Sequence, residues 1–125
     1  MKKIITLIFL VAIVGLFAGT CIKDVSPKSA LGMILCRPDL VVIDVSNGFE
    51  DGHIPAAKNL AVEDGTLYQN LSKLDKSKKY LIYADNELDS KLGAKLLAES
   101  GFENVYRLRG EFKAWTDSGY RVAMN

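Results

Sequence analysis

Three carboxylates stand close together in the segment YLIYADNELDSK, residues 80–91. Asp85, Glu87 and Asp89 alternate with other residues after a short apolar run. Alternating oxygen ligands are typical of calcium-binding loops, but this segment lacks the turn glycine and the distal bidentate glutamate of such loops. The same residues could simply precede a helix that Asp89 or Ser90 caps, because carboxylates stabilise a helix N-terminus. The segment could therefore bind a cation, bind a basic partner or cap a helix.

Few other side chains could bind or react. Asp44 ends an apolar run, where a carboxylate needs hydrogen-bond partners, so we expect it to order the next turn. His53, in the segment GHIP, is the only histidine of the chain, and we expect it to make a local turn contact. Cys36 lies near the end of a predicted helix, where we expect a buried or half-buried structural thiol. Apart from the cation alternative at the acidic segment, the sequence therefore predicts no metal site, and it predicts no cofactor.

The composition fits one compact domain. The chain has 125 residues, 49% of them hydrophobic, and a formal net charge of +1. This length leaves room for one domain and little else. Because the basic residues are scattered rather than clustered on one predicted face, a nucleic-acid partner is not expected.

The first 20 residues have the composition of a targeting segment. Lys2 and Lys3 precede the apolar run IITLIFLVAIVGLFAGT, as the n-region precedes the h-region in a secretory signal. The run stops at Cys21 and resembles a bacterial lipoprotein signal, although a threonine precedes the cysteine. Residues 1–20 are therefore expected to be a signal peptide, with Cys21 lipidated, or a retained membrane anchor. Either way, residues 21–125 are expected to be exported and membrane-associated, on the periplasmic or extracellular face of the cell envelope.

Hydrophobic periodicity predicts strands that alternate with helices. Short apolar runs rich in β-branched residues are typical of strands buried on both faces, and leucines at helical spacing are typical of amphipathic helices. We expect residues 23–26 to be a tether before a first helix that begins at Pro27. In the helix after the acidic segment, Leu92, Leu96 and Leu97 are expected on the buried side. We expect strands at 40–45, 57–60, 78–84 and 104–108, and helices at 26–36, 65–75, 89–102 and 110–120.

This order of elements predicts an α/β fold, with a mostly parallel sheet and helices on both faces. Binding sites in such folds lie beyond the carboxyl ends of the strands. Two stretches are expected there, the turn after Asp44 and the loop at residues 84–89.

Three segments together resemble the rhodanese-like domain. They are VVIDVSNGFEDGHIPAAKNL, YLIYADNELDSKLGAKLLAESGFENVYRLRG and EFKAWTDSGYRV, and the resemblance extends from about Val25 to Val122. It implies a single rhodanese-like domain, whose loop after the central strand begins with a catalytic cysteine. In this family the cysteine accepts sulfur as a persulfide, and backbone amides and a helix N-terminus favour its thiolate.

This chain departs from the family at the positions that matter for that reaction. The resemblance places the cysteine position at Ala84, and arginines that are common in the family correspond to Asp89 and Ser46. The second glycine usual before the last helix corresponds to Glu111. The degenerate loop that the resemblance defines comprises Ala84, Asp85, Asn86, Glu87, Leu88 and Asp89.

The expected function is therefore a non-catalytic binding or scaffolding module with a protein partner in the cell envelope. Asp44 and Ser46 are expected to support the loop. Two alternatives stay open. The chain could carry sulfur on Cys36 or Cys21, or the acidic loop at 84–89 could make the module responsive to a cation.

Overall fold

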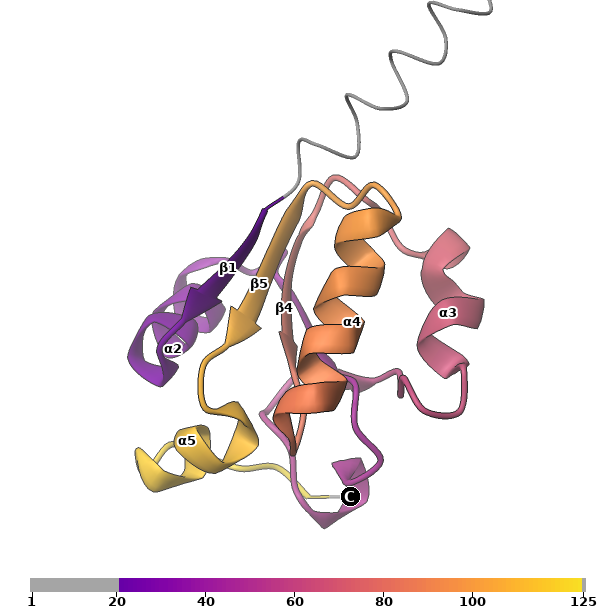
Figure 1. The fold of residues 1–125 in the computed structure, drawn as a ribbon. Coiled ribbons are helices and arrows are strands. Elements are labelled where there is room, and N and C mark those ends of the chain that lie inside the picture. The colour runs from indigo at the N-terminus through magenta and orange to yellow at the C-terminus, as the bar shows by residue number, and fades with distance from the viewer. Residues whose placement is uncertain (1–20, 125) are drawn as a thin grey trace, which may run out of the picture.

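The structure is a computed structural model that describes residues 21–124. Strands and helices alternate along this part of the chain (Figure 1). No helix within it has the length and apolar character needed to cross a membrane. The predicted leader, residues 1–20, lies outside the described residues. The elements are β1 (Ile22–Val25), α2 (Pro27–Cys36), β2 (Val41–Asp44), η1 (Phe49–Asp51), β3 (Lys58–Asn59), α3 (Thr66–Asn70), η2 (Leu71–Lys73), β4 (Lys79–Tyr83), α4 (Glu87–Glu99), β5 (Asn104–Leu108) and α5 (Glu111–Asp117).

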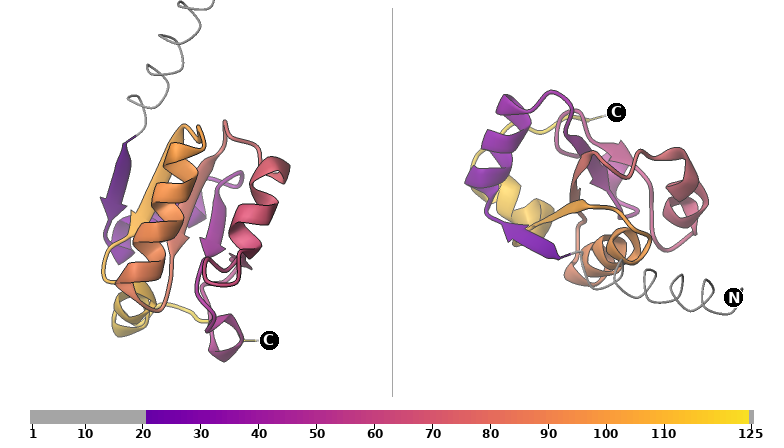
Figure 2. Two further views of the ribbon diagram at one scale, coloured as in Figure 1. Left: turned by 45° about the vertical axis from the view of Figure 1, so that its right-hand side comes forward. Right: turned by 90° about the horizontal axis from the view of Figure 1, so that it is seen from above.

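The five strands form one parallel sheet in the order β1-β5-β4-β2-β3, with β4 at its centre. Helices α3 and α4 cover one face, and α2 and α5 cover the other (Figures 1 and 2). The predicted α/β fold is confirmed. The helix expected at 65–75 divides into α3 and η2, and the strand expected at 57–60 shortens to β3.

Successive side chains of the central strand enter two different cores. Tyr80 and Ile82 of β4 face the core beneath α3 and α4, whereas Leu81 and Tyr83 face the core beneath α2 and α5. Because both faces of the strand are buried, its sequence is a continuous apolar run rather than an alternating one. Trp115 of α5 is buried in the second core.

The tether predicted at 23–26 is wrong, because Ile22–Val25 forms β1 and pairs with β5 at the edge of the sheet. Three of its four residues are exposed, so hydrophobic periodicity could not identify it as a strand. The first helix begins as predicted. Pro27 is its first residue, and the Ser26 hydroxyl accepts a hydrogen bond from the first turn.

Helix α4 packs closely on the sheet through small residues. It buries Ser90, Gly93 and Ala94, and an added Cβ at Gly93 would lie only 3.0 Å from the methyl groups of Val45. Leu92, expected on the buried side, is instead 45% exposed. The close contact at Gly93 therefore sets the distance and rotation of α4 against the sheet.

We expect Gly93→Ala to lower the free energy of unfolding by about 1–3 kcal/mol, because the added methyl group overpacks Val45. Gly32→Ala in α2 is the matched control, since no atom lies within 4 Å of an added Cβ there. Alanine at that position should stabilise the protein by about 0.5–1 kcal/mol. Urea unfolding followed by the fluorescence of the single tryptophan would measure both changes. Equal stabilisation by the two substitutions would contradict the contact.

Candidate functional site

The acidic loop leaves the carboxyl end of β4, at the centre of the sheet. Ala84 is fully buried, and α4 begins three residues later. The helix is capped by Asn86, whose Oδ1 accepts a hydrogen bond from the Asp89 N–H at 2.8 Å. The expected cap at Asp89 or Ser90 is wrong, because Asn86, three residues upstream of the expected helix start, is itself among the preferred caps.

The loop turns most of its side chains to solvent. Asp85, Asn86, Glu87 and Leu88 are exposed, whereas Asp89 is buried. The Asn86 amide donates hydrogen bonds to Asp85 Oδ1 at 2.7 Å and to Asp89 Oδ2 at 3.1 Å. One amide therefore holds two carboxylates beside the N-terminus of α4, where the helix dipole favours negative charge.

A further carboxylate joins the loop from the segment after β3. The neighbouring Asp89 carboxylate raises the pKa of the exposed Glu63, and Asp85 and Asp64 act in the same direction. Among residues 21–124, no ion pair joins a lysine or arginine to Asp85, Asp89 or Glu63. The same residues contain no group of three or more potential ligands arranged to hold a metal ion. The carboxylates at this edge of the sheet are therefore balanced by hydrogen bonds and the helix dipole rather than by paired cations.

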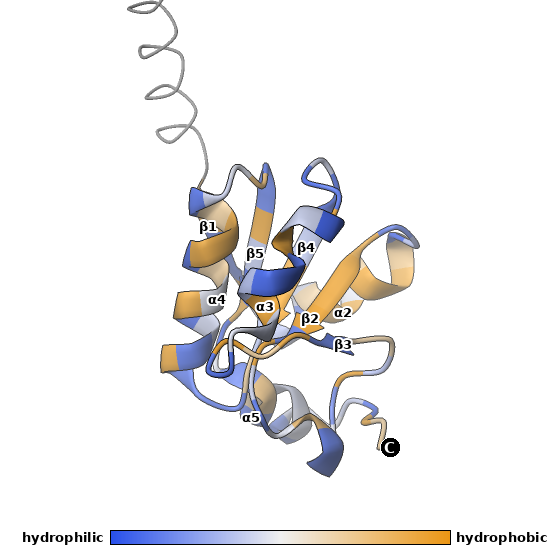
Figure 3. Cartoon of the chain, turned by 90° about the vertical axis from the view of Figure 1, so that its right-hand side faces the viewer, coloured by the Kyte–Doolittle hydropathy of each residue, from blue (hydrophilic) through white to orange (hydrophobic). Residues whose placement is uncertain are grey.

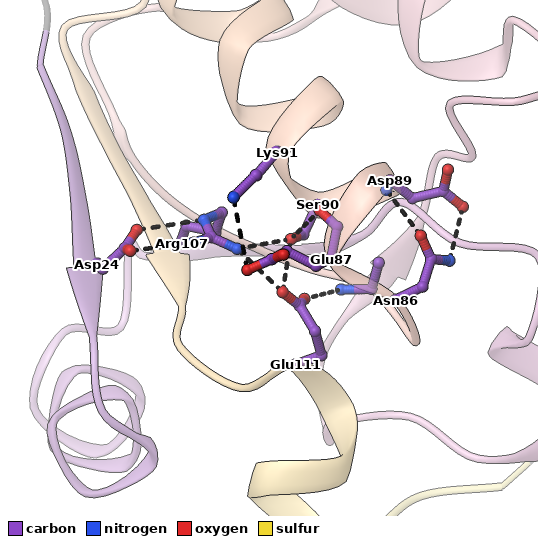
Figure 4. Close-up of polar contacts among 9 residues, drawn as sticks. Asp24, Asn86, Glu87, Asp89, Ser90, Lys91, Arg107 and Glu111 are labelled. Carbon is purple, nitrogen blue, oxygen red and sulfur yellow. Dashed lines mark hydrogen bonds and ion pairs between the residues drawn. The ribbon is translucent and has the colours of Figure 1, made fainter.

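Beneath the loop lies a buried carboxylate, that of Glu111 at the start of α5 (Figure 4). Its Oε1 accepts a hydrogen bond from the Ala84 N–H at 3.3 Å, and its Oε2 accepts one from the Ser90 hydroxyl at 2.7 Å. Burial raises the pKa of the Glu111 carboxyl, and these hydrogen bonds and the charge of Arg107 oppose the shift. Glu111 thus forms hydrogen bonds both with the first residue of the loop and with the helix that follows the loop.

Arg107 of β5 joins this carboxylate to the edge of the sheet. Its Nη1 donates to Glu111 Oε2 and to Ser90 Oγ, both at 3.0 Å. Its Nε and Nη2 donate to the two carboxylate oxygens of Asp24 at 3.2 and 3.0 Å. The buried guanidinium therefore connects β1, β5, α4 and α5, and such paired geometry is favourable for arginine.

The second predicted stretch adjoins the loop. Asp44 is buried at the end of β2, and its Oδ1 accepts a hydrogen bond from the Ser46 N–H at 2.9 Å. Burial raises the pKa of the Asp44 carboxyl, and the bonds from Ser46 oppose this. Asp85 lies against Gly48, since its Oδ2 would be 2.9 Å from an added Cβ there. The structure therefore brings the two stretches together, while their supporting role in a functional site stays a prediction.

Of the remaining candidates, only the two cysteines lie away from the loop. His53 Nδ1 is 3.1 Å from the Phe49 carbonyl oxygen, which confirms the local turn contact. Cys21 and Cys36 are both exposed and free, so the buried or half-buried thiol predicted at Cys36 is wrong. Cys21 precedes β1, and Cys36 ends the helix that returns to the start of β2. Both thiols therefore lie toward the amino ends of the parallel strands, opposite the 84–89 loop.

Sequence reasoning missed the roles of Asp24 and Arg107, and treated Glu111 only as a replaced glycine. One signal was available, an arginine inside the otherwise apolar strand NVYRL with a glutamate four residues later. Such a residue needs a partner if the strand is buried. Its second partner, Asp24, is 83 residues away and no local pattern points to it.

An open parallel sheet with helices on both faces, and with polar loops gathered at its carboxyl edge, defines the class of open α/β folds. A model of one family, the Rhodanese-like domain, matches residues 26–118, and the chain belongs to that family. A relative named thiosulfate sulfurtransferase GlpE, from Coxiella burnetii, is 34% identical over 95 residues, which cover 74% of this chain and 86% of the relative. The uncharacterized protein YqhL of Bacillus subtilis is 30% identical over 79 residues, covering 63% of this chain and 61% of that protein.

Solved structures show the same fold. The Alr3790 protein from Anabaena superposes with a TM-score of 0.74 at 23% identity, over 81% of this chain and 82% of that chain. The polysulfide-sulfur transferase homodimer from Wolinella succinogenes gives a TM-score of 0.68 at 22% identity, over 100% of this chain and 93% of that chain. At these identities the likeness extends to the fold alone.

We expect Glu111→Gln to lower the free energy of unfolding by about 1–3 kcal/mol, because it removes the charge that Arg107 faces in a buried setting. Asp117→Asn is the matched control, since it breaks the exposed Lys113–Asp117 pair, also four residues apart. That change should cost less than about 0.5 kcal/mol. Urea unfolding would compare the two variants, and equal costs would mean that the buried network does not stabilise the fold.

Proposed function

We propose that this chain is an exported, membrane-tethered rhodanese-like domain that binds a protein partner and performs no sulfur transfer. The observation that carries the proposal is alanine at position 84, at the carboxyl end of the central strand. A persulfide needs sulfur on the protein, and an alanine methyl group provides no atom that can hold it. A loop that keeps its place at this edge of the sheet without a nucleophile is suited to binding instead.

The charges around the loop also support a non-catalytic role. Thiosulfate, named in the activity of the Coxiella burnetii relative, is an anion. Asp85, Asp89 and Glu63 have no cationic side chain paired with them among residues 21–124. Two like charges about 4 Å apart in partly exposed surroundings repel each other by on the order of 1 kcal/mol or more. An anionic sulfur donor is therefore disfavoured at this edge.

The alternative of sulfur carriage on Cys21 or Cys36 gains no support from the fold. Both cysteines lie toward the amino ends of the strands, away from the loop and the α4 N-terminus. The helix dipole and loop amides that would favour a thiolate act at the opposite edge. Neither thiol therefore stands where the fold would activate it.

The position of Cys21 also gives the proposed tether a direction. The residue stands just before β1, at the amino edge of the sheet, whereas the 84–89 loop is at the carboxyl edge (Figure 1). If residues 1–20 or a lipid on Cys21 hold the chain to a membrane, the loop faces away from the bilayer. A loop in that orientation is accessible to a partner in the envelope.

We expect the native chain to form no thiocyanate from thiosulfate and cyanide above the rate in buffer, because no thiol stands at the loop. The Coxiella burnetii sulfurtransferase, assayed in parallel, is the positive control. Mass spectrometry after incubation with thiosulfate should show no gain of one sulfur on Cys21 or Cys36. Turnover by the native chain that Cys36→Ser or Cys21→Ser abolishes would establish the sulfur-carrier alternative instead.

We expect the full-length chain, expressed in bacterial cells, to sediment with membranes and to resist extraction by high salt, because residues 1–20 or a lipid anchor it. A chain that lacks residues 1–21 is the control and should stay in the supernatant. Labelling with radioactive palmitate that Cys21→Ser abolishes would assign the anchor to lipid. Recovery of the full-length chain in the supernatant would disprove the tether.

A further inference from the structure

Helix α4 leaves a row of leucines outside both cores. Leu88 is 68% exposed and Leu92, one turn later, is 45% exposed. Leu96, a further turn along, is only half buried. Residues four apart lie on the same side of a helix, so the three side chains form one stripe. Figure 3 shows hydrophobic residues recurring along α4, next to α3.

A groove lies along this stripe. It has a volume of about 310 Å³ and runs between α4 and the segment after β3. Val62, Leu92 and Leu96 provide its apolar lining, and Lys95 and Glu99 also line it. A groove of this size accepts two or three aliphatic side chains of a partner, since a leucine side chain occupies on the order of 100 Å³ at protein packing density.

Carboxylates adjoin the residues that line the groove. Glu63 follows Val62 directly, and Asp89 precedes Leu92 by one turn of α4. Glu63 and Asp89 lie so close that the pKa of the Glu63 carboxyl is raised. The nearby lysines do not offset these charges, because Lys91 pairs with Glu87 at 3.5 Å and Lys95 with Glu99 at 4.0 Å. Apolar contact area and unpaired negative charge therefore adjoin.

We propose that this acidic–apolar surface, formed by Glu63, Asp85, Val62, Leu92 and Leu96, binds a partner segment with aliphatic side chains beside lysines or arginines. The inference rests on the proposed role as a binding module and specifies the chemistry of its partner. Aliphatic side chains would fill the groove, and the cations would pair with the carboxylates.

Two other occupants fit this surface less well. A second copy of the chain would bring the same acidic end, while its α4 lysines are already paired on their own helix. An anionic lipid surface would be repelled by the carboxylates. A basic, aliphatic peptide segment complements both parts of the surface.

The test uses the full-length chain in neutral phosphatidylcholine nanodiscs, with empty nanodiscs as the blank. Three fluorescent helical peptides share a length of about 16 residues. The first has leucines at i, i+4 and i+8 with three lysines at one end, the second has glutamates for the lysines, and the third has serines for the leucines. We expect only the first to bind, with a micromolar Kd by fluorescence anisotropy, and its affinity to fall as salt rises.

Variants of the chain then locate the binding surface. Leu92→Ser should weaken binding of the first peptide at least tenfold, and Glu63→Gln about threefold. Leu35→Ser is the matched control, because Leu35 is 73% exposed on α2, over the other face of the sheet. That variant should change the affinity less than twofold.

Several results would overturn the proposal. They are equal binding of all three peptides, no effect of Leu92→Ser, binding to anionic vesicles that Glu63→Gln strengthens, and self-association in sedimentation that Leu92→Ser abolishes. The sulfur-transfer assay is independent of this surface. Absent peptide binding together with absent sulfur transfer would reject the surface and leave the non-catalytic role standing.

Discussion

The buried guanidinium of Arg107 is the constraint on which the arrangement of this domain depends. A charge taken out of water is costly unless it is paired and hydrogen-bonded, and three elements supply the partners. Asp24 comes from β1, Ser90 from α4 and Glu111 from α5. Because each partner must reach the same side chain, the arginine fixes the edge strand and two helices relative to β5. The 84–89 loop follows, since Glu111 also holds the Ala84 N–H.

Glu111 meets this demand in a strained backbone conformation. Its φ of +63° lies in the left-handed region, which costs a non-glycine residue on the order of 1 kcal/mol or more. Hydrogen bonds from Ala84, Ser90 and Arg107 offset that cost. A glycine would relax the backbone but would leave Arg107 with one carboxylate partner. Glu111 therefore adopts a strained backbone conformation but fixes the 84–89 loop through its hydrogen bonds. A fixed loop presents its exposed carboxylates in one arrangement.

The sequence predicted what periodicity and composition encode, namely the α/β class, the parallel sheet and the place of the loop at its carboxyl edge. It failed where a structure depends on residues far apart in the sequence, or where several neighbouring residues could play the same role. The strand at Ile22–Val25 is mostly polar and exposed, and its strongest tie is the pair of Asp24 with a residue 83 positions away. The cap at Asn86 competes with suitable side chains nearby, so only the backbone geometry decides. The exposure of Cys36 at the end of a helix depends on tertiary packing, which hydrophobic periodicity does not describe.

The rotation of α4 connects the buried network with the outer surface. An α-helix turns about 100° per residue, so the side that faces the sheet determines which side faces solvent. Ser90 must reach Glu111 and Arg107, and Gly93 must face Val45, because no other residue type fits there without displacement. With both positions fixed inward, Leu88 and Leu92 have no place in the core and remain exposed. The apolar stripe on α4 is therefore a consequence of the polar network beneath it, and a change that rotates the helix would alter the outer surface as well as the loop.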